Sequence, residues 1–216
     1  MSVHAVIFDM DGLLMDSEGI GLTVMRDCGL RQGIDIPLDR IRQTLGSSAP
    51  SITKFYLQFY PNLNPPQLFQ DFREGMHALA RAGKIPLKKG AKELLSWLEA
   101  HRIPCAVASS SGLSTIQIYL EQAGVLSFFS ALISCGRDLP SKPAPDIFLK
   151  AADALHTPPR DCLVLEDSIN GVKAGRAAGM TVFMVPDLIP YTADLAPFCD
   201  AVLPDLNAVI PYLEAP

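Results

Sequence analysis

The stretch from Val3 to Gly12 reads VHAVIFDMDG, and it sets the expectation for the whole chain. The apolar run Val3–Phe8 has no polar/apolar alternation, which is typical of a strand buried on both faces of a parallel sheet. Similar runs recur at Cys105–Ala108, Ala131–Ser134, Cys162–Leu165, Thr181–Val185 and Ala201–Leu203. Helical patterns separate them, at Ala91–His101, Ser114–Gln122, Asp146–Leu155 and Asn170–Ala178. This alternation predicts an α/β fold with a doubly wound, Rossmann-like parallel sheet.

One long interval interrupts the alternation. The first apolar run ends at Phe8 and the next begins only at Cys105, although a crossover between parallel strands needs only about a dozen residues. Most of the excess, residues 17–84, has helical periodicity broken by prolines. We therefore expect a core made of residues 1–16 and 85–216 and a helical cap made of residues 17–84. The cap would lie above the carboxyl ends of the strands, where open α/β sheets bind ligands.

The bulk composition narrows the class of protein. The 216 residues include 18 basic and 23 acidic side chains, and this net charge of −5 does not attract nucleic acid or an anionic membrane. No run approaches the roughly 18 consecutive apolar residues of a membrane span, and the first residues do not resemble a signal peptide. The five cysteines are scattered singly, as reduced core residues are. We expect a cytoplasmic monomer that acts on a small molecule, without nucleic-acid or membrane partners.

Acidic pairs follow two of the predicted strands. Asp9 and Asp11 follow the first strand, and Glu166 and Asp167 follow the strand Cys162–Leu165. Each pair alone also fits an ordinary role, a tight turn in the first case and a helix N-cap in the second. If the two strands are neighbours, however, four carboxylates meet at one edge of the sheet and their repulsion calls for a cation. Oxygen ligands without a nearby His or Cys favour Mg²⁺.

Two further motifs follow predicted strands. The sequence VASSSG at residues 107–112 places hydroxyls and free amides at a helix start, where they can bind phosphate, although serines there also serve as ordinary caps. In SKPAP at residues 141–145, Pro143 favours an extended backbone at Lys142. A lysine held in this way can direct its ammonium group at a phosphoryl group. The ordinary interpretation is a solvated lysine in a loop.

Taken in order, the four motifs resemble those of the haloacid dehalogenase superfamily, specifically its phosphatases with a helical cap. That group contains β-phosphoglucomutase and sugar-phosphate phosphatases. The resemblance covers essentially the whole chain and is carried by residues 8–18, 107–111, 141–146 and 165–175. It implies that Asp9 is the nucleophile and Asp11 the general acid/base, which protonates the leaving alcohol and then deprotonates the attacking water. Asp11 would then need a raised pKa, for which the neighbouring carboxylates are the expected cause.

The resemblance also implies a metal site and a phosphate site. The metal site would hold Mg²⁺ through the side chains of Asp9 and Asp167 and the backbone carbonyl of Asp11, with Glu166 supporting from nearby. The phosphate site would use Ser109 and Lys142, with Ser110 and Ser111 as further contributors. These assignments predict a phosphatase that hydrolyses a small organic phosphomonoester through an aspartyl-phosphate on Asp9.

A phosphosugar mutase of the β-phosphoglucomutase type is the nearest alternative. A mutase has to hold a second phosphate and to keep water away from the phosphoryl group. The family's gating histidine, its arginine for the distal phosphate and a lysine after the second motif correspond here to Gly21, Ala49 and Gly112. We therefore favour hydrolysis. A receiver-like phosphoacceptor also uses clustered Asp, Ser/Thr and Lys residues, but it is much shorter and has no inserted cap.

The substrate is the least constrained property. Gly46–Thr53 in the cap is the candidate segment for contacts with the leaving group, and its serines suit a sugar or polyol. Asn170, one helical turn beyond Glu166, is a candidate supporting residue, and Glu18 is interpreted as part of a helix start. The four histidines lack the spacing of metal ligands, and no role is assigned to them: His4, His77, His101 and His156.

Overall fold

The computed structural model describes residues 3–135 and 139–214. Within them, six strands form one sheet in the order β3-β2-β1-β4-β5-β6, and all neighbouring strands are parallel. The strands are β1 Ala5–Phe8, β2 Cys105–Ser109, β3 Ala131–Ser134, β4 Cys162–Glu166, β5 Thr181–Met184 and β6 Ala201–Val202. Because β1 lies between β2 and β4, the strands that precede the two acidic pairs are neighbours. The order of strand addition reverses at β1, and open α/β sheets bind ligands at such a point.

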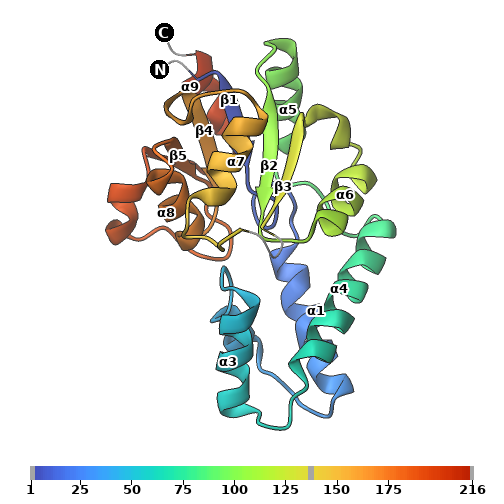
Figure 1. Ribbon diagram of the computed structural model, residues 1–216. Helices are drawn as coiled ribbons and strands as arrows, with labels where there is room; N and C mark the ends of the chain where they lie inside the picture. Colours follow the sequence, from blue (N-terminus) through green and yellow to red (C-terminus); the bar gives the residue numbers. More distant parts are fainter. Residues whose placement is uncertain (1–2, 136–138, 215–216) are drawn as a thin grey trace.

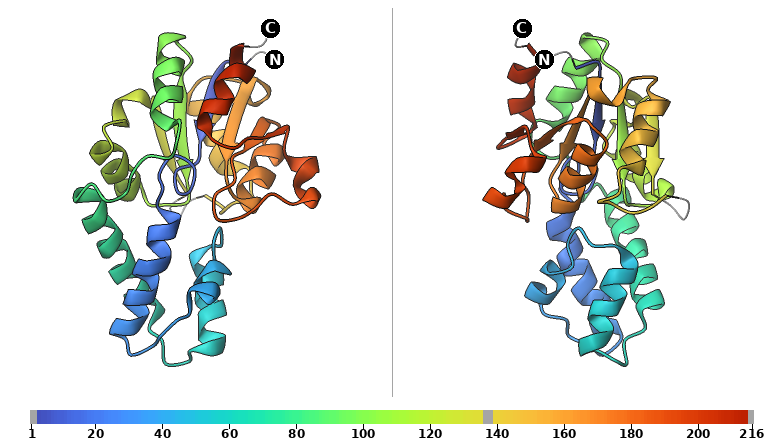
Figure 2. Two further views of the ribbon diagram at one scale, coloured as in Figure 1. Left: turned by 180° about the vertical axis from the view of Figure 1, so that it is seen from behind. Right: turned by 60° about the vertical axis from the view of Figure 1, so that its left-hand side comes forward.

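Helices cover both faces of the sheet (Figure 2). Short 3₁₀ turns, η1 (Leu126–Phe128) and η2 (Pro159–Asp161), lie in two of the connections. One face packs against α5 (Ala91–Ala100), α6 (Leu113–Gln122), η4 (Leu206–Val209) and α9 (Ile210–Glu214). The other face packs against α7 (Asp146–Ala154), α8 (Ile169–Ala177) and η3 (Ala193–Phe198).

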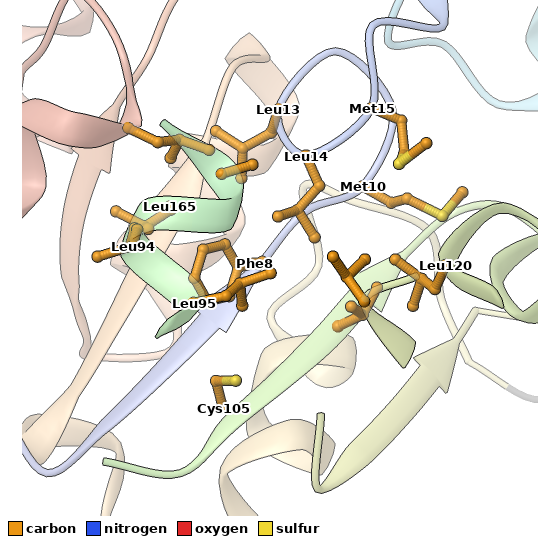
Figure 3. Close-up of a cluster of buried hydrophobic side chains, with 14 of the residues drawn as sticks. Phe8, Met10, Leu13, Leu14, Met15, Leu94, Leu95, Cys105, Leu120 and Leu165 are labelled. Atoms are coloured by element: carbon orange, nitrogen blue, oxygen red, sulfur yellow. The ribbon is translucent and has the colours of Figure 1, made fainter. Parts of the chain in front are cut away.

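The central strand β1 is buried on both faces. Val6 and Phe8 belong to the hydrophobic cluster under α5 and α6, which Figure 3 shows around Phe8. Ala5 and Ile7 belong to the opposite cluster, with Phe148 of α7. Full burial of a large apolar side chain contributes about 1.5–3 kcal/mol. The end of β1, where the first acidic pair begins, is therefore one of the most firmly held points of the core.

Four helices lie beyond one end of the sheet and form the cap (Figure 1). They are α1 (Glu18–Arg31), α2 (Leu38–Arg42), α3 (Ala49–Phe59) and α4 (Pro65–Arg81). They enclose a hydrophobic cluster of their own, in which Tyr56 and Leu68 have no exposed surface. All four helices fall within residues 17–84, the segment predicted as the cap, whose boundaries stay a prediction.

The predicted fold class is confirmed. Each expected strand is present, with ends shifted by one or two residues; β1, for example, begins at Ala5 and not at Val3. All five cysteines are free, and four of them are buried. Among the described residues, the search for a helix long and apolar enough to cross a membrane found none.

Candidate active site

The end of β1 carries Asp9 and Asp11 into a cavity between the core and the cap. The Asp9 amide donates to the Leu165 carbonyl (3.0 Å), which continues the parallel pairing of β1 with β4. Gly12 then turns the chain with a φ of 83°, in the left-handed region that favours glycine. A Cβ atom at this position would clash with the Asp167 carboxylate. Glycine therefore allows the loop after β1 to lie against the acid that follows β4.

Lys142 is buried among three acceptors. Its ammonium donates to Asp9 Oδ1, to Glu166 Oε1 (2.7 Å) and to the Ala108 carbonyl (3.1 Å). Burial alone would lower the pKa of Lys142, but Asp9 and Glu166 outweigh that effect and raise it. All three N–H groups of the ammonium are thus engaged, and Lys142 stays charged beside the predicted nucleophile.

Glu166 lies in a different environment from the one predicted. Its Oε2 accepts hydrogen bonds from the amides of Asp167 and Ser168 and from the Ser168 hydroxyl, each at 2.9 Å, and its Oε1 accepts from Lys142. A Cβ atom at Gly171 of α8 would clash with this carboxylate, so α8 closes over it. Both oxygens are thus occupied by donors of the protein, and Glu166 contacts Lys142 directly. Its support of a metal ion from nearby stays a prediction.

Two serine hydroxyls hold Asp11. Ser17 Oγ donates to Asp11 Oδ1 (2.8 Å) and Ser111 Oγ donates to Asp11 Oδ2 (2.7 Å). Burial raises the pKa of Asp11, as its predicted role requires, whereas the two hydroxyls act in the opposite direction. The expected cause, neighbouring carboxylates, is therefore wrong. Ser111 contacts Asp11, while Ser109 is buried and Ser110 is exposed, and all three serines line the cavity.

Three buried carboxylate oxygens in this region have no hydrogen-bond partner among the described residues. They are Asp167 Oδ2, Glu18 Oε2 and Asp187 Oδ2. Burial, followed by the charges of Glu166 and Asp9, raises the pKa of Asp167. Burial and the charge of Asp187 raise the pKa of Glu18 to about 8. Buried carboxylate oxygens that lack partners are costly unless a cation neutralises them.

The donor set fits Mg²⁺. Within residues 3–135 and 139–214, no group of three or more His, Cys, Asp or Glu residues is placed to hold an ion by side chains alone. The predicted metal site needs only two side-chain ligands, the carboxylates of Asp9 and Asp167, because its third protein ligand is the backbone carbonyl of Asp11. Mg²⁺ commonly takes one or two carboxylates and keeps several waters. The unpartnered Asp167 Oδ2 supports such a site.

The cavity has a volume of about 660 Å³, which lies within the range of roughly 300–1,000 Å³ that small-molecule sites occupy. Its core side contains Asp9, Asp11, Ser109, Lys142 and Asp167. Its cap side is formed by α1, α4 and the segment around α2 and α3, which includes residues 46–50 and Ile52 of the candidate segment Gly46–Thr53. The structure thus brings every predicted catalytic and phosphate-binding residue to one cavity.

Besides the bond from Ser17, the first residue of the predicted cap, to Asp11, two side-chain hydrogen bonds connect the described residues of the cap to the core beside this cavity. Asn170 Nδ2 donates to the Gly46 carbonyl (2.8 Å), and Figure 1 shows the loop before α3 extending toward the core. His77 Nε2 and Thr115 Oγ1 form the second bond, also at 2.8 Å. Asn170, the candidate supporting residue, therefore contacts the cap.

Several cavity residues were missed at the level of sequence. Ser17 and Glu18 lie in the motif after the first strand and both line the cavity. The sequence assigns no role to Ser17, and the interpretation of Glu18 as a helix start, although correct, does not reveal its place in the cavity. Arg73 and His77 line the cavity from α4. The only signal for them is their spacing of four residues, which places both on one face of a helix.

Comparison with known proteins agrees with this geometry. The family model for haloacid dehalogenase-like hydrolases matches residues 3–179. The chain belongs to this family. The match confirms the resemblance seen in the motifs and the expectation of an enzyme of the hydrolase class.

Relatives and solved structures extend the comparison. A probable pseudouridine-5'-phosphatase from Drosophila melanogaster is 36% identical over 192 residues, covering 84% of this chain and 80% of the relative. Hexitol phosphatase B from Escherichia coli (strain K12) is 32% identical over 190 residues, covering 85% and 84%. The structure of CbbY from Rhodobacter sphaeroides with phosphate matches with a TM-score of 0.82 and 24% identity over 96% of both chains. A β-phosphoglucomutase from Clostridium difficile matches with a TM-score of 0.81 and 22% identity, covering 98% and 96%. These two structures support the fold alone.

Proposed function

We propose that this protein is a Mg²⁺-dependent phosphatase that hydrolyses a small sugar phosphomonoester through an aspartyl-phosphate on Asp9. One observation carries the proposal: Asp9, buried at the end of β1, lies in one cavity with the Lys142 ammonium, the doubly held Asp11 and the unpartnered Asp167. Relatives named as phosphatases support the same reaction class.

In the first step, an Asp9 carboxylate oxygen attacks phosphorus and the bond from phosphorus to the leaving oxygen breaks. Asp11 gives its proton to that oxygen, so the product leaves as an alcohol. In the second step, Asp11 takes a proton from water, the water oxygen attacks the phosphorus, and the bond to Asp9 breaks. Inorganic phosphate is released and both aspartates return to their starting states.

Lys142 and Ser109 suit the phosphoryl oxygens. Lys142 already contacts Asp9, so a phosphoryl group on Asp9 lies within reach of the same ammonium. Asp9, Asp167 and the Asp11 carbonyl would hold Mg²⁺. When bound, this ion supplies positive charge that reduces the repulsion between a carboxylate nucleophile and a phosphate dianion.

Hydrolysis is favoured over mutase chemistry by the residues at three cavity positions. Gly21, Ala49 and Gly112 all line the cavity, and none of them offers a cation for a second phosphate. The β-phosphoglucomutase similarity is a similarity of fold. We expect a hexose 1-phosphate to be dephosphorylated, with no 6-phosphate isomer visible by NMR.

The decisive experiment is a phosphate-release screen over sugar, polyol, nucleotide and glycolytic phosphoesters, with Mg²⁺ and with a chelator. Asp9→Asn should lower turnover on the order of 10⁴-fold, because it removes the nucleophile. Asp16→Asn is the matched control; the Asp16 side chain is 53% exposed, and within the described residues its one ion pair is with Lys88 (3.7 Å). Turnover by Asp9→Asn equal to that of Asp16→Asn would eliminate the nucleophile assignment. Acid-quenched mass spectrometry of the wild type should find the phosphoryl group on Asp9.

A further inference from the structure

Helix α4 turns one mixed face toward the cavity. Phe69, Phe72, Arg73, Met76 and His77 all line it, and their spacing of three and four residues places them on a single helical stripe. Three of the five are apolar and two are basic. The face differs from the core side of the cavity, where carboxylates, serines and a lysine predominate.

The apolar part of this face disfavours a leaving group that consists only of hydroxyl-bearing carbons. The Phe72 ring lies beside Gly21, where a Cβ atom would be 3.5 Å from the ring, and α1 adds Leu22 and Met25 to the same wall. Hydroxyls pressed against such a wall lose water without gaining hydrogen-bond partners, and this desolvation has a free-energy cost. A planar ring can lie against it without that cost.

The basic part of the face offers hydrogen-bond donors at a defined place. Arg73 is exposed and makes no ion pair or side-chain hydrogen bond within the described part of the chain. His77, one turn further, is fixed by its bond to Thr115 of α6 (2.8 Å). Burial, together with Arg81 and Arg73, lowers the pKa of His77, so its ring is neutral at physiological pH. An unpaired guanidinium beside an apolar wall suits an oxygen acceptor on a ring.

Resting on the proposed phosphatase function, we infer that the α4 face selects sugar phosphates whose sugar carries a planar heterocycle with acceptor oxygens, the chemistry of a nucleoside 5′-monophosphate. The phosphate occupies the core side, the sugar lies by Ser47 and Ser48 of the cap loop, and the ring packs on Phe69 and Phe72. Arg73 donates to the ring oxygens. Open-chain polyol phosphates lack the ring that this wall receives.

The test compares uridine 5′-monophosphate with sorbitol 6-phosphate under the same Mg²⁺ concentration. We expect the wild type to have a kcat/KM at least about 10-fold higher for the ring-bearing ester. A site selects strongly against a substrate whose hydroxyls it would bury without hydrogen-bond partners. Arg73→Gln should raise KM for uridine 5′-monophosphate about 10-fold and change kcat little, because a lost hydrogen bond to a charged donor weakens binding. Arg81→Gln, on the same helix but outside the cavity lining, is the matched control and should behave as the wild type.

Equal kcat/KM values for the two esters, or equal KM values for Arg73→Gln and Arg81→Gln, would overturn the inference and leave the phosphatase intact. If the wild type released phosphate from no ester in the screen, the proposed function would fall first. Calorimetric titration of Asp9→Asn with uridine 5′-monophosphate supplies a readout without turnover. Binding there should weaken about 10-fold when Arg73→Gln is added.

Discussion

The core side and the cap side of the cavity are constructed differently. On the core side, buried polar groups have specific partners: Lys142 has three acceptors, Glu166 Oε2 has three donors and Asp11 has two hydroxyls. On the cap side, the wall is mainly apolar and, besides the Ser17 bond to Asp11, two side-chain hydrogen bonds connect its described residues to the core. Buried networks of the first kind hold one geometry, because each lost bond leaves a buried group unpaired. A wall of the second kind is attached to the core by fewer polar contacts and by apolar packing of α4 residues such as Met76 and Ala80.

This difference separates two tasks. Phosphoryl transfer requires reacting groups held close to one arrangement, and the core supplies it through the ends of β1, β2 and β4. Substrate entry and product release require motion, and cap movements serve this purpose in many enzymes. Substitutions on the core side should therefore reduce chemistry and stability together, whereas substitutions on the cap side should change mainly the affinity for substrate.

The largest effect is expected at Lys142. Lys142→Met leaves Asp9 and Glu166 buried without their counter-ion, and breaking a buried pair in this way costs about 3–5 kcal/mol. Turnover should fall by roughly 10²–10³-fold, since charge stabilisation at the phosphoryl group is also lost. Urea unfolding and phosphate release measure the two quantities.

Lys89→Met is the control for Lys142→Met. The Lys89 side chain is 79% exposed and pairs with Asp205, so the loss of stability there should be small beside that of Lys142→Met. Adding Glu166→Gln to Lys142→Met should recover part of the stability but none of the turnover. Equal stability losses for the two lysine variants would contradict the contrast between a buried network and a solvated surface.

The second effect concerns the dependence of stability on pH and Mg²⁺. The raised pKa values of Glu18 (about 8) and Asp167 mean that the metal-free folded state binds more protons than the unfolded state above about pH 4. The free energy of unfolding therefore falls as pH rises from about 5 to about 8. Mg²⁺ at about 100 times its dissociation constant should add about 2.7 kcal/mol at pH 8 and less at pH 6, where protons compete for the carboxylates.

Differential scanning calorimetry with a chelator or with Mg²⁺ checks this pH dependence. We expect Glu18→Gln to flatten the decline of the melting temperature in the metal-free protein, because it removes one of the titrating groups. Sodium chloride at matched ionic strength controls for general screening. A melting temperature that rises with pH in the chelated sample would show that burial and neighbouring charges do not raise the pKa values of these acids.

The sequence allows prediction of the core more fully than of the cap. Apolar runs with acids at their ends indicate the strands, while the adjacency of β1 and β4 is a condition that the sequence leaves open and the structure fulfils. The partner of each acid does not follow: Glu166 and Asp167 are neighbours in sequence, yet Glu166 accepts from Lys142 while Asp167 Oδ2 has no hydrogen-bond partner among the described residues. Such pairings depend on backbone turns such as Gly12, where a side chain would clash with Asp167.

For the cap, prediction from the sequence is limited by a different cause. The helical periodicity of Phe69, Phe72 and Met76 is evident in the sequence, but an apolar stripe that faces a hydrophobic core and one that faces a ligand have the same pattern. Arg73 and His77 fall on that stripe, and only the position of α4 over the sheet shows that they reach the cavity. The fold therefore had to be known before the cap-side residues could be assigned.

A smaller effect should follow from removing the hydroxyls that hold Asp11. Ser17→Ala or Ser111→Ala removes a donor to the ionised carboxylate, so the pKa of Asp11 rises further. Because Asp11 must be protonated in the first step, the alkaline limb of the profile of kcat/KM against pH should shift to higher pH. At neutral pH, kcat/KM should fall about 5-fold from the lost orientation, as for one hydrogen bond of about 1 kcal/mol. Ser114→Ala, at an exposed position of α6, controls for the substitution itself, and an unmoved alkaline limb in both test variants would exclude the role.

The smallest effect is expected at the contact between the cap and the core. Asn170→Ala removes the bond to the Gly46 carbonyl, which contributes at most about 1 kcal/mol because both groups gain water when the cap separates from the core. KM should rise about 2- to 4-fold, whereas kcat should stay level, or increase if cap opening limits product release. Asn62→Ala, at an exposed position of the cap, is the matched control. A loss of kcat in Asn170→Ala as large as that in Lys142→Met would mean that the cap holds the reacting groups as firmly as the core does. The division between the two sides of the cavity would then have to be abandoned.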